Sequence, residues 1–292
     1  MKSQQVLKSS NNKKVVIESL HCKDCGSSYD AKYYTFSNGW KWQTNRSGLC
    51  SNCQEKRIKE IDQQEKAKIQ DEKVGMREKW RRNCGIPLKY QYKGFQHFEQ
   101  GWQPKAYLQI HDYACNFPII NPKGYKSLVL FSTQSWGTGK THLACSVAHH
   151  ILSRWDGETS SCPVRFVSEP MLFKSIRDTY DFTPLQKQTQ DNEIQIINKL
   201  INVPLLIIDD LGKEDVADLR FVQRTLFAIF DGRYNAELPV LITANLDDAG
   251  LRAHMGGSSG NEAAFNRLIE MCKGEFIRMD GKSYREKLSR EG

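Results

Sequence analysis

Residues 132–141 read STQSWGTGKT, which is the pattern of a phosphate-binding loop. An apolar stretch at 128–131 precedes the loop and a helix-like stretch at 142–148 follows it, as the motif requires. Backbone N–H groups at a helix N-terminus form a nest for an anion, Lys140 supplies a cation for the β- and γ-phosphates, and the Thr141 hydroxyl can ligate Mg²⁺. We therefore expect a nucleoside triphosphate to bind the residues Ser135, Trp136, Gly137, Thr138, Gly139, Lys140 and Thr141.

One position departs from the pattern G-x-x-x-x-G-K-[ST], because Gln134 stands where the first glycine is usual. That glycine relaxes the turn out of the strand, whereas Gly137 and Gly139 are where the backbone must come closest to phosphate. The substitution weakens the match and leaves the phosphate-binding groups in place. The alternative is a glycine-rich turn between strand and helix that binds nothing.

A pair of carboxylates supplies the second half of a nucleotide site. The apolar run 205–208 is typical of a strand covered on both faces of a parallel sheet, and Asp209 and Asp210 follow at its carboxyl end. Ligands of open α/β sheets bind outside those ends, so both carboxylates would face the phosphates. We expect Asp209 to hold Mg²⁺ directly or through water, and Asp210 to orient or deprotonate the attacking water. The alternative is that the pair only caps the next turn.

Two further strand-like runs extend the predicted sheet. The run 238–244 ends in Asn245, whose amide can hold the attacking water or sense the γ-phosphate, although a simple Asx turn is the alternative. The run 164–167 lies between the loop and Asp209. This extra strand favours the ATPase branch with an inserted strand over the simpler kinase-like branch.

Several segments together carry a family resemblance. They are WGTGKTHLA (136–144), RFVSE (165–169), IRDTY (176–180), LIIDDLGKE (206–214), NRLI (266–269) and SYR (283–285). From about Cys84 to Arg285 the chain resembles the bacterial replicative helicase loaders of the DnaI and DnaC type, within the wider group that includes the IstB transposition ATPases. The resemblance implies an α/β fold, namely an AAA+ P-loop ATPase domain with a central parallel sheet that binds ATP and Mg²⁺ and assembles side by side with copies of itself.

The same resemblance assigns roles to two arginines. An arginine of the helix before the last strand reaches into the neighbouring subunit's ATP in that family, and Arg267 matches it here. Arg285, of the Ser-Tyr-Arg segment, matches the arginine that senses the nucleotide. A guanidinium delivered in trans neutralises charge that develops on the transferring phosphoryl group, so hydrolysis becomes conditional on assembly. For each arginine the alternative is an ordinary surface or ion-pair role.

The function that the resemblance implies is ATP-dependent loading of a hexameric replicative helicase onto single-stranded DNA. The segment 169–180 corresponds to an insertion that helps line the DNA path, where Lys174, Arg177 and Tyr180 can contact backbone and base. Leu172, Phe173 and Ile176 have the spacing of core residues instead. Two alternatives remain: a transposition helper ATPase of the IstB type, and a non-hydrolysing ATP-binding adaptor in which Gln134 marks a decayed site.

Two Cys-x-x-Cys knuckles mark the N-terminal region, formed by Cys22 with Cys25 and by Cys50 with Cys53. Two residues between thiols let both sulfurs of a knuckle reach one tetrahedral ion, and two knuckles complete its shell. Neither knuckle is followed by His, which excludes the haem-attachment motif, and a redox dithiol explains one knuckle better than two. We therefore expect one structural Zn²⁺.

These motifs divide the chain into three parts. We expect residues 1–53 to form a zinc-binding domain, residues 54–83 a charged helical linker, and residues 84–292 the ATPase domain. The family resemblance implies that the zinc-binding domain recruits the helicase as a partner. Opposite charges four residues apart, such as Glu55 and Lys59, favour the linker helix, and we expect a break near Gly75.

Composition bounds the remaining questions. The chain of 292 residues has a formal net charge of +8, which suggests an anionic partner without identifying one. Five of its nine cysteines are scattered singly, which indicates reduced thiols. The sequence has neither the apolar core of a signal peptide nor an apolar stretch long enough to span a bilayer. We therefore expect a cytoplasmic protein with no membrane partner.

Overall fold

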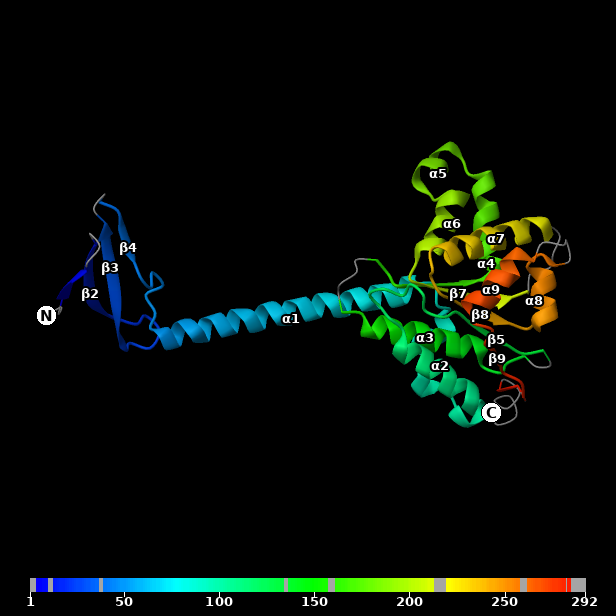
Figure 1. The fold of residues 1–292 in the computed structure, drawn as a ribbon, viewed down its shortest axis with the longest axis horizontal. Helices are drawn as coiled ribbons and strands as arrows, with labels where there is room; N and C mark the ends of the chain where they lie inside the picture. Colours follow the sequence, from blue (N-terminus) through cyan, green and yellow to red (C-terminus); the bar gives the residue numbers. More distant parts are fainter. Residues whose placement is uncertain are drawn as a thin grey trace. The chain divides into compact units, whose positions relative to one another are not determined.

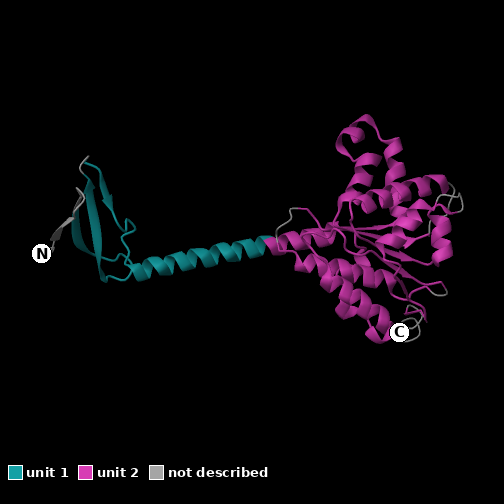
Figure 2. Ribbon diagram, in the orientation of Figure 1, with its two compact units in different colours: residues 1–72 teal, residues 73–292 magenta. Residues whose placement is uncertain are grey.

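The computed structural model describes residues 4–9, 13–36, 39–133, 136–156, 161–212, 219–257, 262–281 and 283–284. Contacts between Cα atoms divide the chain into two compact units, residues 1–72 and residues 73–292 (Figure 2). No helix among the described residues is both long enough and apolar enough to cross a bilayer.

The first unit is built on an antiparallel sheet of four strands in the order β1-β2-β3-β4 (Figure 1). Ala31 of β3 and Leu49, which precedes the second knuckle, are buried in this small unit. The strands are β1 (Gln4–Ser9), β2 (Lys13–His21), β3 (Ser28–Phe36) and β4 (Lys41–Gln43).

A single helix, α1 (Ser51–Asn83), contains the predicted linker and crosses the division between the two units. The helix predicted over residues 54–82 is confirmed, but the break expected near Gly75 is wrong because α1 continues through that residue. One glycine costs a helix only about 1 kcal/mol, and its strong helix-forming neighbours outweigh this cost. At the end of α1, Trp80 packs edge-on against Trp155 with ring centroids 4.3 Å apart.

The second unit is built on a parallel sheet of five strands in the order β6-β7-β8-β5-β9. Strand β8 lies between β5, which leads into the phosphate-binding loop, and β7, which ends in the two aspartates. The predicted α/β class and the central parallel sheet are therefore confirmed, and the run 164–167 forms a strand, β6, at the edge of the sheet. The strands are β5 (Leu128–Phe131), β6 (Val164–Ser168), β7 (Leu205–Leu211), β8 (Val240–Ala244) and β9 (Phe276–Arg278).

Helices cover both faces of this sheet (Figure 1). Helices α2 (Pro104–Asn116) and α3 (Lys140–Arg154) pack with Leu205 and Ile207 of β7, whereas Leu206 and Ile208 face the opposite core. Burial on both faces explains why β7 is apolar throughout. The other helices of this unit, which form the second layer of helices, are α4 (Glu169–Asp178), α5 (Pro184–Thr189), α6 (Glu193–Asn202), α7 (Leu219–Asn235), α8 (Asp248–His254) and α9 (Ala263–Met271).

Two features of the second layer matter for stability. The residues predicted as core in α4, namely Leu172, Phe173 and Ile176, are buried. Arg233 of α7 is fully buried, and its guanidinium donates hydrogen bonds to backbone carbonyls at the end of α6 and beyond. The last carbonyls of a helix have no partner within it, so Arg233 satisfies groups that would otherwise be buried unpaired. Its acceptors are the carbonyls of Leu200, Ile201, Val203, Pro204 and Pro239.

Candidate nucleotide-binding site

The loop between β5 and α3 has the backbone shape of a phosphate nest. Gly137 and Gly139 have φ angles of +80° and +98°, a left-handed conformation that side chains with a Cβ adopt rarely. A Cβ at Gly139 would also lie 2.5 Å from Cε2 of Phe98. Both glycines are therefore required by this geometry, while Gln134 and Ser135 lie outside the described residues.

Lys140, the first residue of α3, has its ammonium group inside the site. The residue is 6% exposed, and Nζ donates to Ser132 Oγ at 2.5 Å and to Asn245 Oδ1 at 2.8 Å. These bonds join the loop to the residue that follows β8. The structure thus brings Lys140 and Asn245 together, as expected for groups at the carboxyl edge of one parallel sheet.

Asp209 and Thr141, the two predicted Mg²⁺ ligands, are in direct contact. Asp209 is 5% exposed and accepts from Thr141 Oγ1 at 3.0 and 3.2 Å and from Thr243 Oγ1 at 2.6 Å. Hydroxyl and carboxylate oxygens are the hard ligands that Mg²⁺ prefers. The pair therefore fits this ion.

Asp210 has a different environment from its neighbour. Its φ is +58°, and its backbone N–H donates to Thr243 Oγ1 at 2.9 Å. The pairing of β7 with β8 shifts register between Ile208 and Leu211, an irregularity that re-aims a side chain. Asp210 consequently lines the cavity, while Asp209 stays buried beneath it.

These groups surround a cavity of about 580 Å³, within the usual size range of small-molecule sites. Its opposite wall, which the sequence motifs did not indicate, comes mainly from the short helical turns before α2. Aromatic and charged residues of this kind can accommodate a base and ribose, but their irregular spacing gives no local signal. The wall residues from this segment are Lys89, Tyr90, Lys93, His97, Phe98, Glu99 and Trp102.

The same wall is fixed to the loop and to α3 by specific contacts. His149 Nε2 lies 2.8 Å from the carbonyl of Tyr90, and burial lowers the pKa of His149. The backbone N–H of Tyr284 donates to the Gly137 carbonyl at 3.1 Å, and its ring packs edge-on against Trp102. Tyr284 therefore lies directly on the phosphate-binding loop.

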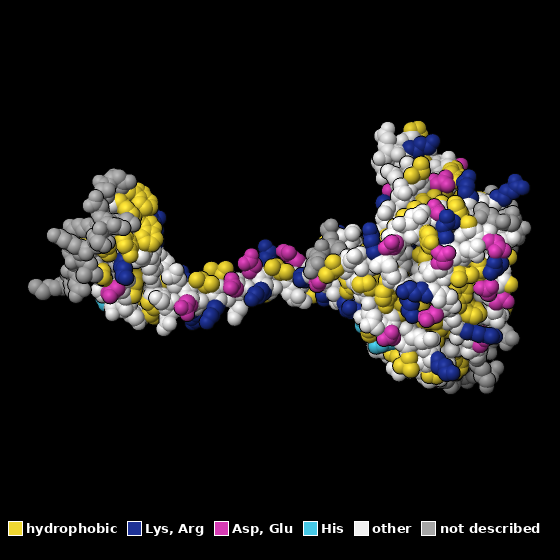
Figure 3. Space-filling view, in the orientation of Figure 1, with side chains coloured by type: hydrophobic (Ala, Val, Ile, Leu, Met, Phe, Trp, Pro, Cys, Tyr) yellow, Lys and Arg dark blue, Asp and Glu magenta, His cyan; other side chains and the backbone are white. Residues whose placement is uncertain are grey.

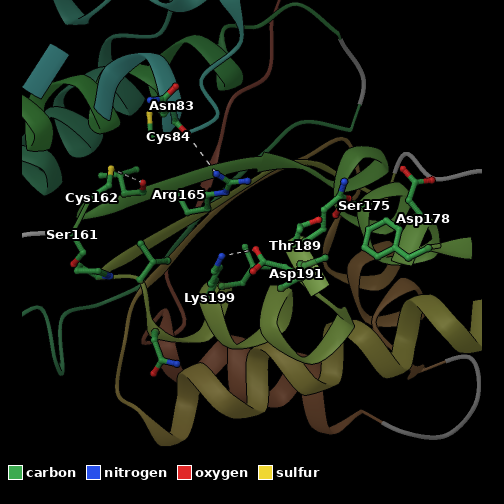
Figure 4. Close-up of a pocket in the computed structure, with 18 residues that line it drawn as sticks. Asn83, Cys84, Ser161, Cys162, Arg165, Ser175, Asp178, Thr189, Asp191 and Lys199 are labelled. Atoms are coloured by element: carbon green, nitrogen blue, oxygen red, sulfur yellow. Dashed lines mark hydrogen bonds and ion pairs between the residues drawn. The ribbon is translucent and has the colours of Figure 1, made fainter. Parts of the chain in front are cut away.

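A larger cavity of about 1000 Å³ lies elsewhere in the second unit, beside the edge strand β6 (Figure 4). Its cations already have partners, since Lys199 pairs with Asp191 and Arg165 donates to the Asn83 carbonyl at 3.5 Å. None of the predicted nucleotide-binding residues lines it. We therefore assign the nucleotide site to the smaller cavity, where the loop and the acidic strand end meet.

Neither of the two predicted arginines is among the described residues that line this cavity. Arg267 of α9 does not line the cavity of its own chain, and its Nη2 pairs with Asp231 Oδ1 at 2.6 Å. Its guanidinium also lies 5.1 Å from the ring centroid of Phe227 and 5.8 Å from that of Tyr234. Arg285 lies outside the described residues.

The first unit holds the predicted zinc ligands together. The sulfurs of Cys22, Cys25, Cys50 and Cys53 all lie within 4.8 Å of one another, and those of Cys25 and Cys50 are 3.6 Å apart. A tetrahedral zinc ion with Zn–S bonds of about 2.3 Å separates its sulfurs by roughly 3.8 Å. The thiol pKa values shift in opposite directions, since the backbone N–H of Cys50 lowers the pKa of Cys22 to about 6, whereas the Cys25 side chain raises the pKa of Cys53. The four cysteines therefore fit Zn²⁺.

A parallel sheet with a phosphate-binding loop after one strand and a buried aspartate near the end of another defines a P-loop nucleotide-binding protein. The model of the family described as IstB-like ATP binding protein matches residues 119–292, and the chain belongs to this family.

Individual relatives agree with this assignment. The replicative helicase loader DnaC of Buchnera aphidicola subsp. Baizongia pistaciae (strain Bp) is 26% identical over 192 residues, which cover 66% of this chain and 68% of that protein. The replicative helicase loader DnaC of Escherichia coli (strain K12) is 26% identical over 114 residues, covering 38% of this chain but only 41% of that protein. The resemblance inferred from the sequence is confirmed.

The chain is also similar to solved structures. The crystal structure of the DnaC helicase loader has a TM-score of 0.49 at 22% identity and covers 66% of this chain and 100% of its own. The crystal structure of DnaI has a TM-score of 0.48 at 21% identity and covers 67% of this chain and 95% of its own.

Proposed function

We propose that this protein is an ATP-dependent loader that binds a hexameric replicative helicase and delivers it onto single-stranded DNA. One observation carries the nucleotide-dependent part: Lys140, Thr141, Asp210 and Asn245, from three separate segments, line one cavity, and Asp209 accepts a hydrogen bond from Thr141 beneath it. The relatives named as replicative helicase loaders support the choice of client.

The residues predicted from the sequence motifs have separate roles in the proposed ATPase. The N–H groups of Gly137, Thr138 and Gly139 and the Lys140 ammonium hold the phosphates. Thr141 and Asp209 hold Mg²⁺, which neutralises charge on the β- and γ-phosphate oxygens when bound.

Water activation falls to the residues at the ends of β7 and β8. The carboxylate of Asp210 takes the proton of the attacking water. Asn245, whose amide oxygen is bonded to Lys140, orients that water beside the γ-phosphate.

Assembly completes the site in this proposal. Arg267 reaches the nucleotide of a neighbouring copy, which is supported by its absence from the lining of its own cavity, and Arg285 senses the nucleotide. Bound ATP then favours self-association and retention of DNA, and hydrolysis releases the loader. The proposed DNA contacts are three residues of the α4 region, Lys174, Arg177 and Tyr180. The guanidinium of Arg177 lies 5.1 Å from the ring centroid of Phe221.

The first unit recruits the helicase in this proposal, with residues 1–53 as the Zn²⁺-binding domain, 54–83 as the linker and 84–292 as the ATPase domain. Aromatic rings form tilted pairs between β3 and the β4 region, Tyr34 with Trp42 and Phe36 with Trp40, each with centroids 5.4 Å apart. Trp40 is 58% exposed and Trp42 is 41% exposed. Figure 3 shows hydrophobic side chains gathered on this unit, and exposed aromatic patches often mark protein interfaces.

Co-purification of the full-length protein from its native host tests the choice of partner. We expect ATP-dependent capture of a ring-shaped helicase, and we expect a Trp40→Ser, Trp42→Ser variant to lose it while it still binds ATP. A matched control variant, Tyr92→Ser, removes an exposed ring of the ATPase unit and should retain capture. Recovery of a transposase in place of a helicase would contradict the proposal.

Two other functions remain candidates. The IstB-like family model favours a transposition helper ATPase, for which the captured transposase is the positive result. A non-hydrolysing adaptor would bind ATP without releasing phosphate. Phosphate release measured with and without single-stranded DNA separates this adaptor from an enzyme.

A further inference from the structure

Glu169, the first residue of α4, is a fully buried carboxylate that no part of the proposed ATPase mechanism uses. Its Oε2 accepts a hydrogen bond from the backbone N–H of Gly212 at 2.7 Å. Its Oε1 lies 2.5 Å from Nε2 of His254, which ends α8 and is 8% exposed. A buried carboxylate with two specific partners holds three elements in one arrangement.

Gly212 is the residue that makes this arrangement relevant to the nucleotide site. It stands two residues after Asp210 and has a φ of +87°. A Cβ at Gly212 would lie 2.1 Å from Cδ1 of Leu246, the residue that follows Asn245. The segment carrying Asp210 is therefore packed closely against the segment carrying Asn245.

The two aspartates at the end of β7 are held by different hydrogen bonds. Asp209 is fixed by its own carboxylate through Thr141 and Thr243. Asp210 lines the cavity, and its backbone is anchored at its own N–H by Thr243 and at Gly212 by Glu169. Without Glu169 the part-buried N–H of Gly212 would lose this acceptor, and the chain could shift to satisfy it elsewhere.

We propose that Glu169, supported by His254, is a positioning residue that holds Asp210 in the geometry needed for ATP hydrolysis. This inference rests on the proposed ATPase function and assigns the regulation of that site to α4. Because Glu169 begins the helix that bears Lys174 and Arg177, movement of α4 on DNA would act on the catalytic strand end through one hydrogen bond.

The test compares Glu169→Leu, which removes the acceptor, with Glu169→Gln, which keeps an oxygen for the Gly212 N–H. We expect Glu169→Leu to lower kcat by about ten- to a hundred-fold while the Kd of a fluorescent ATP analogue changes by less than about threefold, as for lost positioning. Glu169→Gln should retain most of the activity. Glu275→Leu is the control for charge, since Glu275 pairs with the exposed Lys126 away from the cavity.

A second measurement does not depend on hydrolysis. Hydrogen exchange of the segment 205–212 should be faster in Glu169→Leu than in the wild type and unchanged in Glu169→Gln. Should Glu169→Leu fail to fold, His254→Leu removes the partner behind the carboxylate, and we expect a smaller loss of kcat with the same split between kcat and Kd.

Several results would overturn the inference. One is an unchanged kcat and an unchanged exchange rate in Glu169→Leu, or in His254→Leu if that variant replaces it. Another is a Kd for the ATP analogue that rises in step with the loss of kcat. A third is a Glu169→Gln variant that is as inactive as Glu169→Leu. A wild-type protein that binds ATP without releasing phosphate would refute the proposed ATPase instead, and the exchange data would still test the anchor.

Discussion

Replacement of Arg267 by alanine tests whether hydrolysis requires a neighbouring copy. In its own chain the Arg267 guanidinium is paired with Asp231 at 2.6 Å, and the two side chains are 27% and 32% exposed. A pair this exposed contributes about 1 kcal/mol or less, and each nearby ring adds about 0.5–1 kcal/mol. Release of Arg267 therefore costs roughly 1–3 kcal/mol.

The proposed stabilisation of the transition state by Arg267 exceeds the cost of releasing this side chain from Asp231. An arginine delivered in trans raises kcat by about 10³–10⁵, which corresponds to roughly 4–7 kcal/mol in the transition state. Arg267 can therefore leave Asp231 when a neighbour's nucleotide is within reach. We expect Arg267→Ala to lower kcat by about 10³ or more and to leave the Kd for ATP unchanged, because Arg267 does not line its own cavity.

The assay is steady-state phosphate release across a range of protein concentrations with single-stranded DNA present. Arg252→Ala is the matched control, because Arg252 also lies over a ring, that of Phe265 at 4.6 Å, and pairs with Glu262 at 2.5 Å. We expect this variant to keep the wild-type rate.

A mixing experiment separates action in trans from a local effect. Lys140→Ala lacks nucleotide binding but can donate Arg267, whereas Arg267→Ala binds nucleotide but lacks the donor. We expect the mixture to hydrolyse ATP faster than either variant alone. Unchanged turnover in Arg267→Ala, or no recovery in the mixture, would refute the reasoning.

Three other predictions follow from the geometry. Arg233→Met should lower stability by about 3–5 kcal/mol and the melting temperature by about 6–20 °C in thermal denaturation, because buried carbonyls lose their donor; a drop under about 2 °C would contradict this role. Asp209→Asn should raise the Mg²⁺ concentration for half-maximal hydrolysis by about 10–100-fold, and an unchanged Mg²⁺ titration would exclude Asp209 as a metal partner. Cys25→Ser should reduce bound zinc in metal analysis, and wild-type protein without stoichiometric zinc would contradict the metal site.

Local motifs were sufficient to predict which residues lie together at the centre of the candidate nucleotide site. The loop pattern and the rule that ligands bind at the carboxyl ends of parallel strands placed Lys140, Thr141 and Asp209 together, and the Thr141 hydroxyl lies 3.0 Å from Asp209. Paired Cys-x-x-Cys spacing likewise predicted the sulfur cluster. Such signals work because a short segment carries the whole chemical requirement.

Contacts between distant segments were not predictable in this way. Tyr284 bonds to Gly137, and Glu169 meets His254 across 85 residues of sequence, but neither pair leaves a periodic pattern. Arg233 lies in the last turn of α7, where a cationic side chain is often exposed. Only the packing of α6 against α7 makes it a buried hydrogen-bond donor. The break expected near Gly75 failed for the opposite reason, since one residue was given more weight than its helix-forming neighbours.

Equilibrium binding of Mg-ATP by calorimetry, with wild type, Lys140→Ala and the surface control Lys126→Ala, tests the central claim most directly. Lys140 is buried beside the loop, and hydrogen bonds between charged groups contribute about 1.5–3 kcal/mol each. The account predicts one site per chain in the wild type and the control, and at least about a hundredfold weaker binding in Lys140→Ala. Equal affinity in all three proteins would contradict it.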